Sequence, residues 1–182
     1  MSELRDIRAI IIDEKGHAIS LLRNLLIRLG VKRIAALHST EDALRLMREE
    51  TFDVVFCDEF SAPLNPVTFV KAVRRDLTTR DVTVPIVLVS SGASRKQIEL
   101  ARDAGLNDVI AKPVSTDTIE RKLRSMVLAP QAFVTAKTFL GPDRRRAEER
   151  RSDKRPDGAE RRGTGAEGNV FHRRARIRPE DA

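Results

Sequence analysis

The 182-residue chain is 41% hydrophobic, which is enough for one domain with a sizeable core and an additional segment. No apolar run approaches the roughly 20 residues that span a bilayer, and the N-terminal residues lack the basic-then-apolar pattern of a secretory signal. The single cysteine, Cys57, excludes an internal disulfide bond and is typical of a reducing compartment. We therefore expect a cytoplasmic protein.

The net charge of +7 is concentrated toward the C-terminus. Residues 130–182 contain 14 Lys and Arg against 9 Asp and Glu, whereas the first 129 residues contain 20 against 18. A basic segment of this kind can bind nucleic acid, an acidic partner or an anionic membrane surface, or it can simply keep the protein soluble.

Five short apolar runs alternate with segments whose apolar residues recur at helical spacing. The runs have the length and composition of strands buried on both faces, as in parallel sheets. The segments between them begin at hydroxyl residues suited to helix capping, such as Ser39 and Ser94, or end at glycines, such as Gly30 and Gly105. The alternation predicts an α/β fold with a doubly wound, five-stranded parallel sheet. The predicted strands are residues 7–12, 31–37, 52–57, 85–89 and 108–111.

Beyond Pro130 the periodicity stops, and arginine clusters alternate with acidic residues and glycine. Such a segment buries too little apolar area to offset the entropy of ordering it. We therefore predict a folded domain over residues 5–128 and an Arg-rich, low-complexity tail over residues 129–182, largely disordered from about Gly141 onward.

Polar side chains follow four of the predicted strands. Asp13 and Glu14 follow the first, Asp58 the third, Ser90 the fourth and Lys112 the fifth. The carboxyl ends of parallel strands gather at one edge of the sheet, where ligands of such folds bind. Three acids, one hydroxyl and one amine at one place suit a phosphoryl group held on an aspartate beside a divalent cation such as Mg²⁺, which prefers oxygen ligands.

The order of these residues along the chain resembles that of the receiver domain of bacterial response regulators of two-component phosphorelays. The matching residues are the acidic pair, Asp58, Ser90 and the dipeptide Lys112-Pro113. The resemblance covers roughly residues 5–128 and implies a flavodoxin-like sheet with strand order 2-1-3-4-5. It also implies that Asp58 accepts a phosphoryl group from a sensor histidine kinase or phosphotransfer protein. The chain would then signal through a downstream protein that binds one phosphorylation state.

The resemblance assigns a role to each site residue. Asp58 is the acceptor, and Lys112 and Ser90 contact the phosphoryl oxygens. A cis Lys112–Pro113 peptide is implied, and no enzymatic activity beyond self-phosphorylation and autodephosphorylation is expected. The expected Mg²⁺ ligands are Asp13, Glu14, Asp58 and the backbone carbonyl of Phe60.

Two departures from the family pattern support an alternative, a pseudo-receiver that binds partners without phosphate. Prolines at 63 and 66 change the loop after Asp58, with Pro66 in the place of a usual glycine. Val109 stands where an aromatic switch residue is usual, and the chain contains no tyrosine.

Three further interpretations can be weighed against the sequence. The basic tail could bind nucleic acid, with a steep dependence on salt. A phosphohydrolase would need Asp-x-Asp after the first strand, where this chain has Asp13-Glu14-Lys15. The resemblance also implies that the face formed by the fourth and fifth helices is the usual contact surface, so a homodimer through these helices stays open, but the sequence does not give the oligomeric state.

Overall fold

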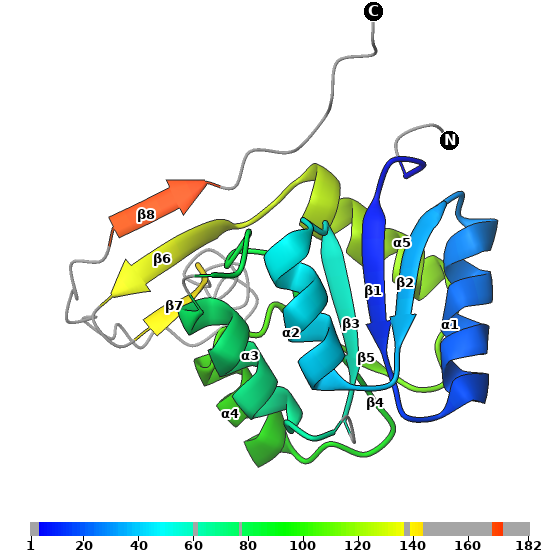
Figure 1. Cartoon of the computed structure of the whole chain (residues 1–182), viewed down its shortest axis with the longest axis horizontal. Coiled ribbons are helices and arrows are strands. Elements are labelled where there is room, and N and C mark those ends of the chain that lie inside the picture. Colours follow the sequence, from blue (N-terminus) through cyan, green and yellow to red (C-terminus); the bar gives the residue numbers. More distant parts are fainter. Residues whose placement is uncertain (1–3, 60–61, 77, 137–138, 144–168, 173–182) are drawn as a thin grey trace, which may run out of the picture.

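The structure is a computed structural model that describes residues 4–59, 62–76, 78–136, 139–143 and 169–172. Within the described residues, five strands alternate with five helices, as the periodicity predicts, and the last helix ends in a π-helical turn (Figure 1). The bounds are β1 (Arg8–Ile12), α1 (Gly16–Arg28), β2 (Arg33–Leu37), α2 (Thr40–Glu49), β3 (Val54–Asp58), α3 (Pro66–Arg75), β4 (Ile86–Ser90), α4 (Arg95–Asp103), β5 (Asp108–Ala111), α5 (Thr116–Leu123) and η1 (Arg124–Leu128).

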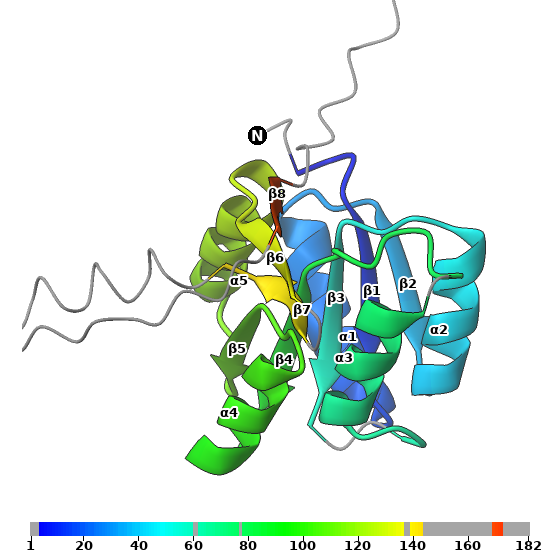
Figure 2. The same cartoon turned by 90° about the vertical axis from the view of Figure 1, so that its left-hand side faces the viewer.

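The five strands form one parallel sheet in the order β2-β1-β3-β4-β5, which confirms the predicted fold class and strand order. The pairing register aligns the strand ends. Ile12 pairs with Cys57, the next residue of β3 is Asp58, and Ser90 pairs with Ala111. The arrowheads of β1 and β2 in Figure 1, and of β3 and β5 in Figure 2, point to the same lower end of the sheet. The polar residues that follow these strands therefore share one edge.

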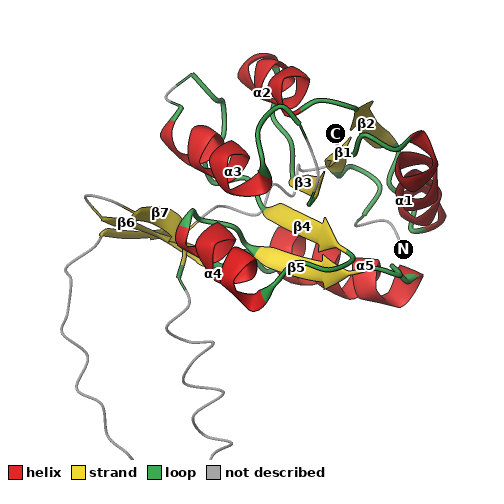
Figure 3. Cartoon of the chain, turned by 90° about the horizontal axis from the view of Figure 1, so that it is seen from below, coloured by secondary structure: helices red, strands yellow, loops and turns green. Residues whose placement is uncertain are grey.

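Helices cover both faces of the sheet (Figure 3). On one face, α2, α3 and α4 bury side chains such as Met47, Phe69 and Ala101 against the strands. On the other, α1 and α5 bury side chains such as Leu26 and Ile119. Every residue of β3 and β4 is buried. Full burial of an aliphatic or aromatic side chain contributes about 1.5–3 kcal/mol, so these central strands hold the site edge rigidly.

Capping residues start the helices beside that edge. The Ser39 side chain accepts hydrogen bonds from backbone amides at the start of α2, and Ser94 with Gln97 forms the predicted capping box of α4. Asn65 caps α3, and Pro66 is its first residue. A proline is favoured there because the amide it lacks would have no partner inside the helix. The residue that departs from the family's glycine thus begins a helix.

A second, three-stranded antiparallel sheet follows the predicted domain, in the order β7-β6-β8. It consists of β6 (Ala132–Ala136), β7 (Phe139–Pro142) and β8 (Asn169–His172). These strands lie within the segment that was predicted as a low-complexity tail, where the sequence shows no strand periodicity. The remaining residues of the predicted disordered tail, including its arginine clusters, lie outside the described residues.

The small sheet is anchored at the amino ends of β4 and β5, far from the polar edge. The Phe133 ring is buried, with the guanidinium carbon of Arg74 5.2 Å from its centre. Arg74 also donates to the carbonyls of Val82 and Gly105. A Cβ on Gly105 would lie 2.4 Å from the carbonyl oxygen of Leu140. The backbone of β7 therefore rests directly on this glycine, which has a φ of +104°.

No helix in the described part of the chain is long and apolar enough to cross a membrane.

Candidate functional site

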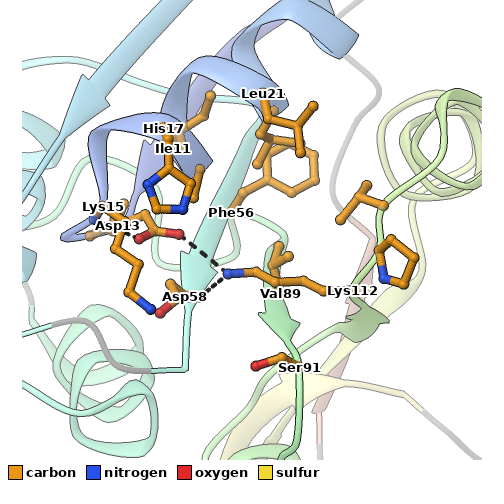
Figure 4. Close-up of a pocket in the computed structure, with 15 residues that line it drawn as sticks. Ile11, Asp13, Lys15, His17, Leu21, Phe56, Asp58, Val89, Ser91 and Lys112 are labelled. Carbon is orange, nitrogen blue, oxygen red and sulfur yellow. Dashed lines mark hydrogen bonds and ion pairs between the residues drawn. The ribbon is translucent and has the colours of Figure 1, made fainter.

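The carboxyl edge of the sheet brings together Asp13, Asp58 and Lys112, three of the predicted site residues (Figure 4). The Nζ atom of Lys112 donates to Asp58 Oδ1 at 2.5 Å and to Asp13 Oδ2 at 3.4 Å. The Asp58 and Asp13 side chains are 5% and 8% exposed, and that of Lys112 is 30% exposed. One ammonium group thus bridges two nearly buried carboxylates.

The electrostatics of this bridge keep Lys112 charged. Burial by itself would lower the pKa of Lys112, because water stabilises the ammonium form. The hydrogen bond and charge of Asp58, followed by the charge of Asp13, act in the opposite direction and leave the pKa of Lys112 raised. The backbone after Lys112 has the cis peptide to Pro113 that the resemblance implies.

Ser90 lies at the end of β4, and its side chain is buried. Its Oγ accepts hydrogen bonds from the amides of Gly92 at 3.2 Å and Ala93 at 2.7 Å. A hydroxyl oxygen has two acceptor positions and one proton, so both acceptor positions are filled. The remaining proton is donated to Glu59 Oε2 at 2.5 Å.

Glu59 also lies at this edge, although the sequence pattern did not predict it. Its Oε1 accepts from the backbone amide of Ser91 at 2.8 Å and from the Ser91 hydroxyl at 2.6 Å. Burial tends to raise the pKa of Glu59, but the hydrogen bonds from Ser90 and Ser91 outweigh it and leave this pKa lowered. The available sequence signal was its position next to Asp58, at the end of a buried strand and opposite two serines.

Only two of the predicted metal ligands, Asp13 and Asp58, lie close together in the described residues. Glu14 is exposed, and Phe60 lies outside the described residues. Within the described residues, no group of three or more His, Cys, Asp or Glu side chains is arranged to hold a metal ion. Asp13 and Asp58 nevertheless touch the same ammonium group, so they are close enough to share one cation. Two carboxylates with water in the other positions are a donor set that Mg²⁺ accepts.

A cavity of about 250 Å³ opens beside the bridge, between α1 and the connection from β5 to α5. Its polar end is formed by Asp13, Asp58 and Lys112, and its walls include Leu21 and Phe56 (Figure 4). A reacting group that enters this cavity meets the buried carboxylates directly.

Two further residues lie in this region. His17 is exposed and also lines the cavity. Cys57 is buried among the side chains of the α2, α3 and α4 face, as the strand alternation predicts.

Comparisons with known proteins identify relatives of this chain. A family model described as the response regulator receiver domain matches residues 9–124. The probable chemotaxis protein CheY of Rhizobium etli is 26% identical over 126 residues, which cover 69% of this chain and 96% of that protein. Chemotaxis protein CheY of Pseudomonas aeruginosa is 25% identical over 119 residues, which cover 65% of this chain and 94% of that protein.

Solved structures show the same fold. The receiver domain of a sensor histidine kinase from Pseudomonas aeruginosa, with a magnesium ion coordinated in its active-site cleft, has a TM-score of 0.58 at 21% identity and covers 65% of this chain and 94% of its own. A CheY-like receiver domain from Methylobacillus flagellatus has a TM-score of 0.56 at 25% identity and covers 66% of this chain and 98% of its own.

The general function of such domains is phosphorylation-based signalling, in which they interact with histidine kinases or phosphotransfer proteins and act as phosphoacceptors rather than as classical enzymes. The family model spans well over half of the sequence and includes Asp13, Asp58, Ser90 and Lys112. The chain therefore belongs to the response regulator receiver domain family.

Proposed function

We propose that this chain is a phospho-accepting response regulator in which Asp58 takes a phosphoryl group from a histidine kinase or phosphotransfer protein. The observation that carries the proposal is the Lys112 ammonium group, which bridges Asp58 and Asp13 at the carboxyl edge of the sheet. A buried nucleophilic carboxylate beside a fixed positive charge is what transfer of an anionic group requires.

The proposed reaction uses these residues as follows. A carboxylate oxygen of Asp58 attacks the phosphorus atom, an acyl phosphate P–O bond forms, and the P–N bond to the donor imidazole breaks. The bond electrons leave with the imidazole nitrogen. Lys112 is placed to hold a phosphoryl oxygen, and Ser90 can donate its proton to another once that proton is free of Glu59.

A divalent cation supplies further neutralisation of charge when it is bound. Asp13 and Asp58 are the residues that would hold it, because both carboxylates already reach one cationic group. Glu14 and the backbone carbonyl of Phe60 remain the other predicted ligands; Glu14 is exposed and Phe60 lies outside the described residues. The donor set fits Mg²⁺, which commonly keeps several water ligands in its octahedron.

The test is incubation of the full chain with Mg²⁺ and acetyl phosphate, followed by intact mass measurement. We expect a gain of about 80 Da, the mass of one covalent phosphate, in the wild type and no gain in an Asp58→Asn control. Omission of Mg²⁺ should remove most of the gain. A wild-type chain that stays folded and gains no mass would refute the proposal.

A second candidate function is a partner-binding module that keeps the receiver fold but does not use phosphate. One observation favours it. Val109, at the position of the family's usual aromatic switch residue, is partly buried and packs against the core cluster of the α2, α3 and α4 face. This side chain has no polar atom to exchange between core and solvent. The same mass experiment separates the two candidates.

A further inference from the structure

The turn after β4 presents three hydrogen-bond donors to one place, which we call the Ser90–Ser91 seat. They are the Ser90 hydroxyl, the Ser91 amide and the Ser91 hydroxyl. The Ser90 proton has only one direction available, because Gly92 and Ala93 fill the two acceptor positions of its oxygen. Donors fixed in this way form a site for an oxyanion.

The Glu59 carboxylate fills this seat completely. Its Oε2 accepts a hydrogen bond from the Ser90 hydroxyl, and its Oε1 accepts hydrogen bonds from the amide and the hydroxyl of Ser91, at distances between 2.5 and 2.8 Å. Hydrogen bonds to a charged acceptor are about twice as strong as neutral ones. Glu59 directly follows Asp58 in the chain, so the group that occupies the seat is tethered beside the phosphoryl acceptor.

A phosphoryl group on Asp58 and the Glu59 carboxylate cannot both use these donors. Ser90 has a single proton, and two anions at one place repel each other. Glu59 therefore has to move away before a phosphoryl oxygen can bind Ser90.

The structure provides a space for that movement. A groove of about 500 Å³ lies between the starts of α3 and α4, and Glu59 itself lines it together with Asn65, Ser91 and Gln97.

We propose that Glu59 is an internal occupant of the Ser90–Ser91 seat, which a phosphoryl oxygen or a free oxyanion must displace, and that Glu59 thereby sets the affinity of the site for phosphate. Displacement by the phosphoryl group of Asp58 rests on the proposed function. Displacement by free phosphate does not depend on the proposed function, because it requires only the three donors of the Ser90–Ser91 seat.

The experiment titrates the full chain with inorganic phosphate in the presence of Mg²⁺ and follows the amide NMR signals of Ser91 and Gly92. Three variants change the occupant in different ways. Glu59→Ala removes the carboxylate, Glu59→Gln removes its charge and one acceptor oxygen, and Glu59→Asp keeps the charge but shortens the reach by one methylene. Glu49→Gln, at an exposed residue at the end of α2, is the control for loss of one negative charge.

The proposal expects all three Glu59 variants to bind phosphate about tenfold more tightly than wild type, which is the ratio that one lost charge-assisted hydrogen bond of the occupant implies. Glu49→Gln should bind like wild type. If Glu59→Gln binds more tightly but Glu59→Asp does not, long-range charge is responsible and occupation of the seat is refuted. Equal affinities in wild type and all variants refute it as well.

Acetyl phosphate labelling of the same variants separates this proposal from the proposed function. Faster labelling of Asp58 in Glu59→Ala than in wild type supports both. If the Glu59 variants bind phosphate more tightly but Asp58 is never labelled, the proposed function is refuted and occupation of the seat by Glu59 is supported. If wild type and Glu59→Ala are labelled at equal rates and bind phosphate equally well, occupation of the seat by Glu59 is refuted and the proposed function is supported.

Discussion

Replacement of Lys112 by alanine tests the central ion-pair bridge through stability, independently of phosphorylation. The change leaves Asp58 and Asp13, at 5% and 8% exposure, without the ammonium group that neutralises them. Removal of one partner from a buried ion pair costs about 3–5 kcal/mol. Lys112 is 30% exposed, so water screens part of the interaction, and we expect a loss of about 2 kcal/mol in the free energy of unfolding.

Urea unfolding measures this loss. With a slope of about 2 kcal/mol per molar urea, the midpoint should fall by about 1 M. The double variant Lys112→Ala with Asp58→Asn should recover part of the stability, because one of the two buried carboxylate charges is gone. Lys32→Ala, which removes an exposed lysine, is the control and should leave the midpoint unchanged. A midpoint shift below about 0.2 M, or a double variant no more stable than the single one, would falsify the stabilising role of the Lys112 bridge.

The difference in unfolding free energy between wild type and Lys112→Ala should depend on pH in a way that follows from the direction of the pKa shift of Lys112. Because the folded protein raises the pKa of Lys112 above its ordinary 10.5, the stabilisation is complete below that value and is lost as pH rises through the folded pKa. The gap between wild type and Lys112→Ala should therefore stay constant from about pH 6 to about pH 9. Addition of Mg²⁺ should stabilise Lys112→Ala more than wild type, because a cation can then take the position of the ammonium group.

Three further predictions concern the rest of the molecule. Phe133→Ala should cost about 3 kcal/mol, since its ring is buried with the Arg74 guanidinium group packed over it; a loss under about 1 kcal/mol by urea unfolding contradicts that anchoring role. Gly105→Ala should displace β7, because the new Cβ would collide with the Leu140 carbonyl, and hydrogen exchange that stays equally slow over residues 132–142 would count against this contact. Hydrogen bonds from Thr78 lower the pKa of Asp76 to about 2, so its stabilising contribution is present above 3.8 and is lost as pH falls toward 2. A carboxyl-carbon NMR titration of Asp76 with a midpoint near 3.8 would disprove this shift.

Part of the site could be predicted from the sequence, because its residues come directly after the predicted strands. Asp58 and Lys112 each follow an apolar run, and in a parallel sheet the carboxyl ends of such runs share an edge. Asp13 follows the same rule. Glu14 does not, because the residue after Asp13 faces solvent, and a linear pattern cannot say which of two adjacent acids turns inward.

Glu59 and the small C-terminal sheet depend on contacts between residues far apart in the chain. Glu59 reaches Ser90 and Ser91, which are 31 and 32 residues away, only because β3 and β4 are neighbours in this register. The strand β6 pairs with β8 more than 30 residues later, and its Phe133 is buried by an arginine of α3.

The sequence by itself therefore determined the alternation of strands and helices, the family and the position of Asp58 at a strand end, since these depend on local periodicity and on residues at strand ends. Only the tertiary structure decided which carboxylates share the Lys112 ammonium group and which anion occupies the Ser90–Ser91 seat. The physical reason is that hydrogen bonds and ion pairs form over distances of about 3 Å, and such distances between remote residues are set by the packing of the whole sheet.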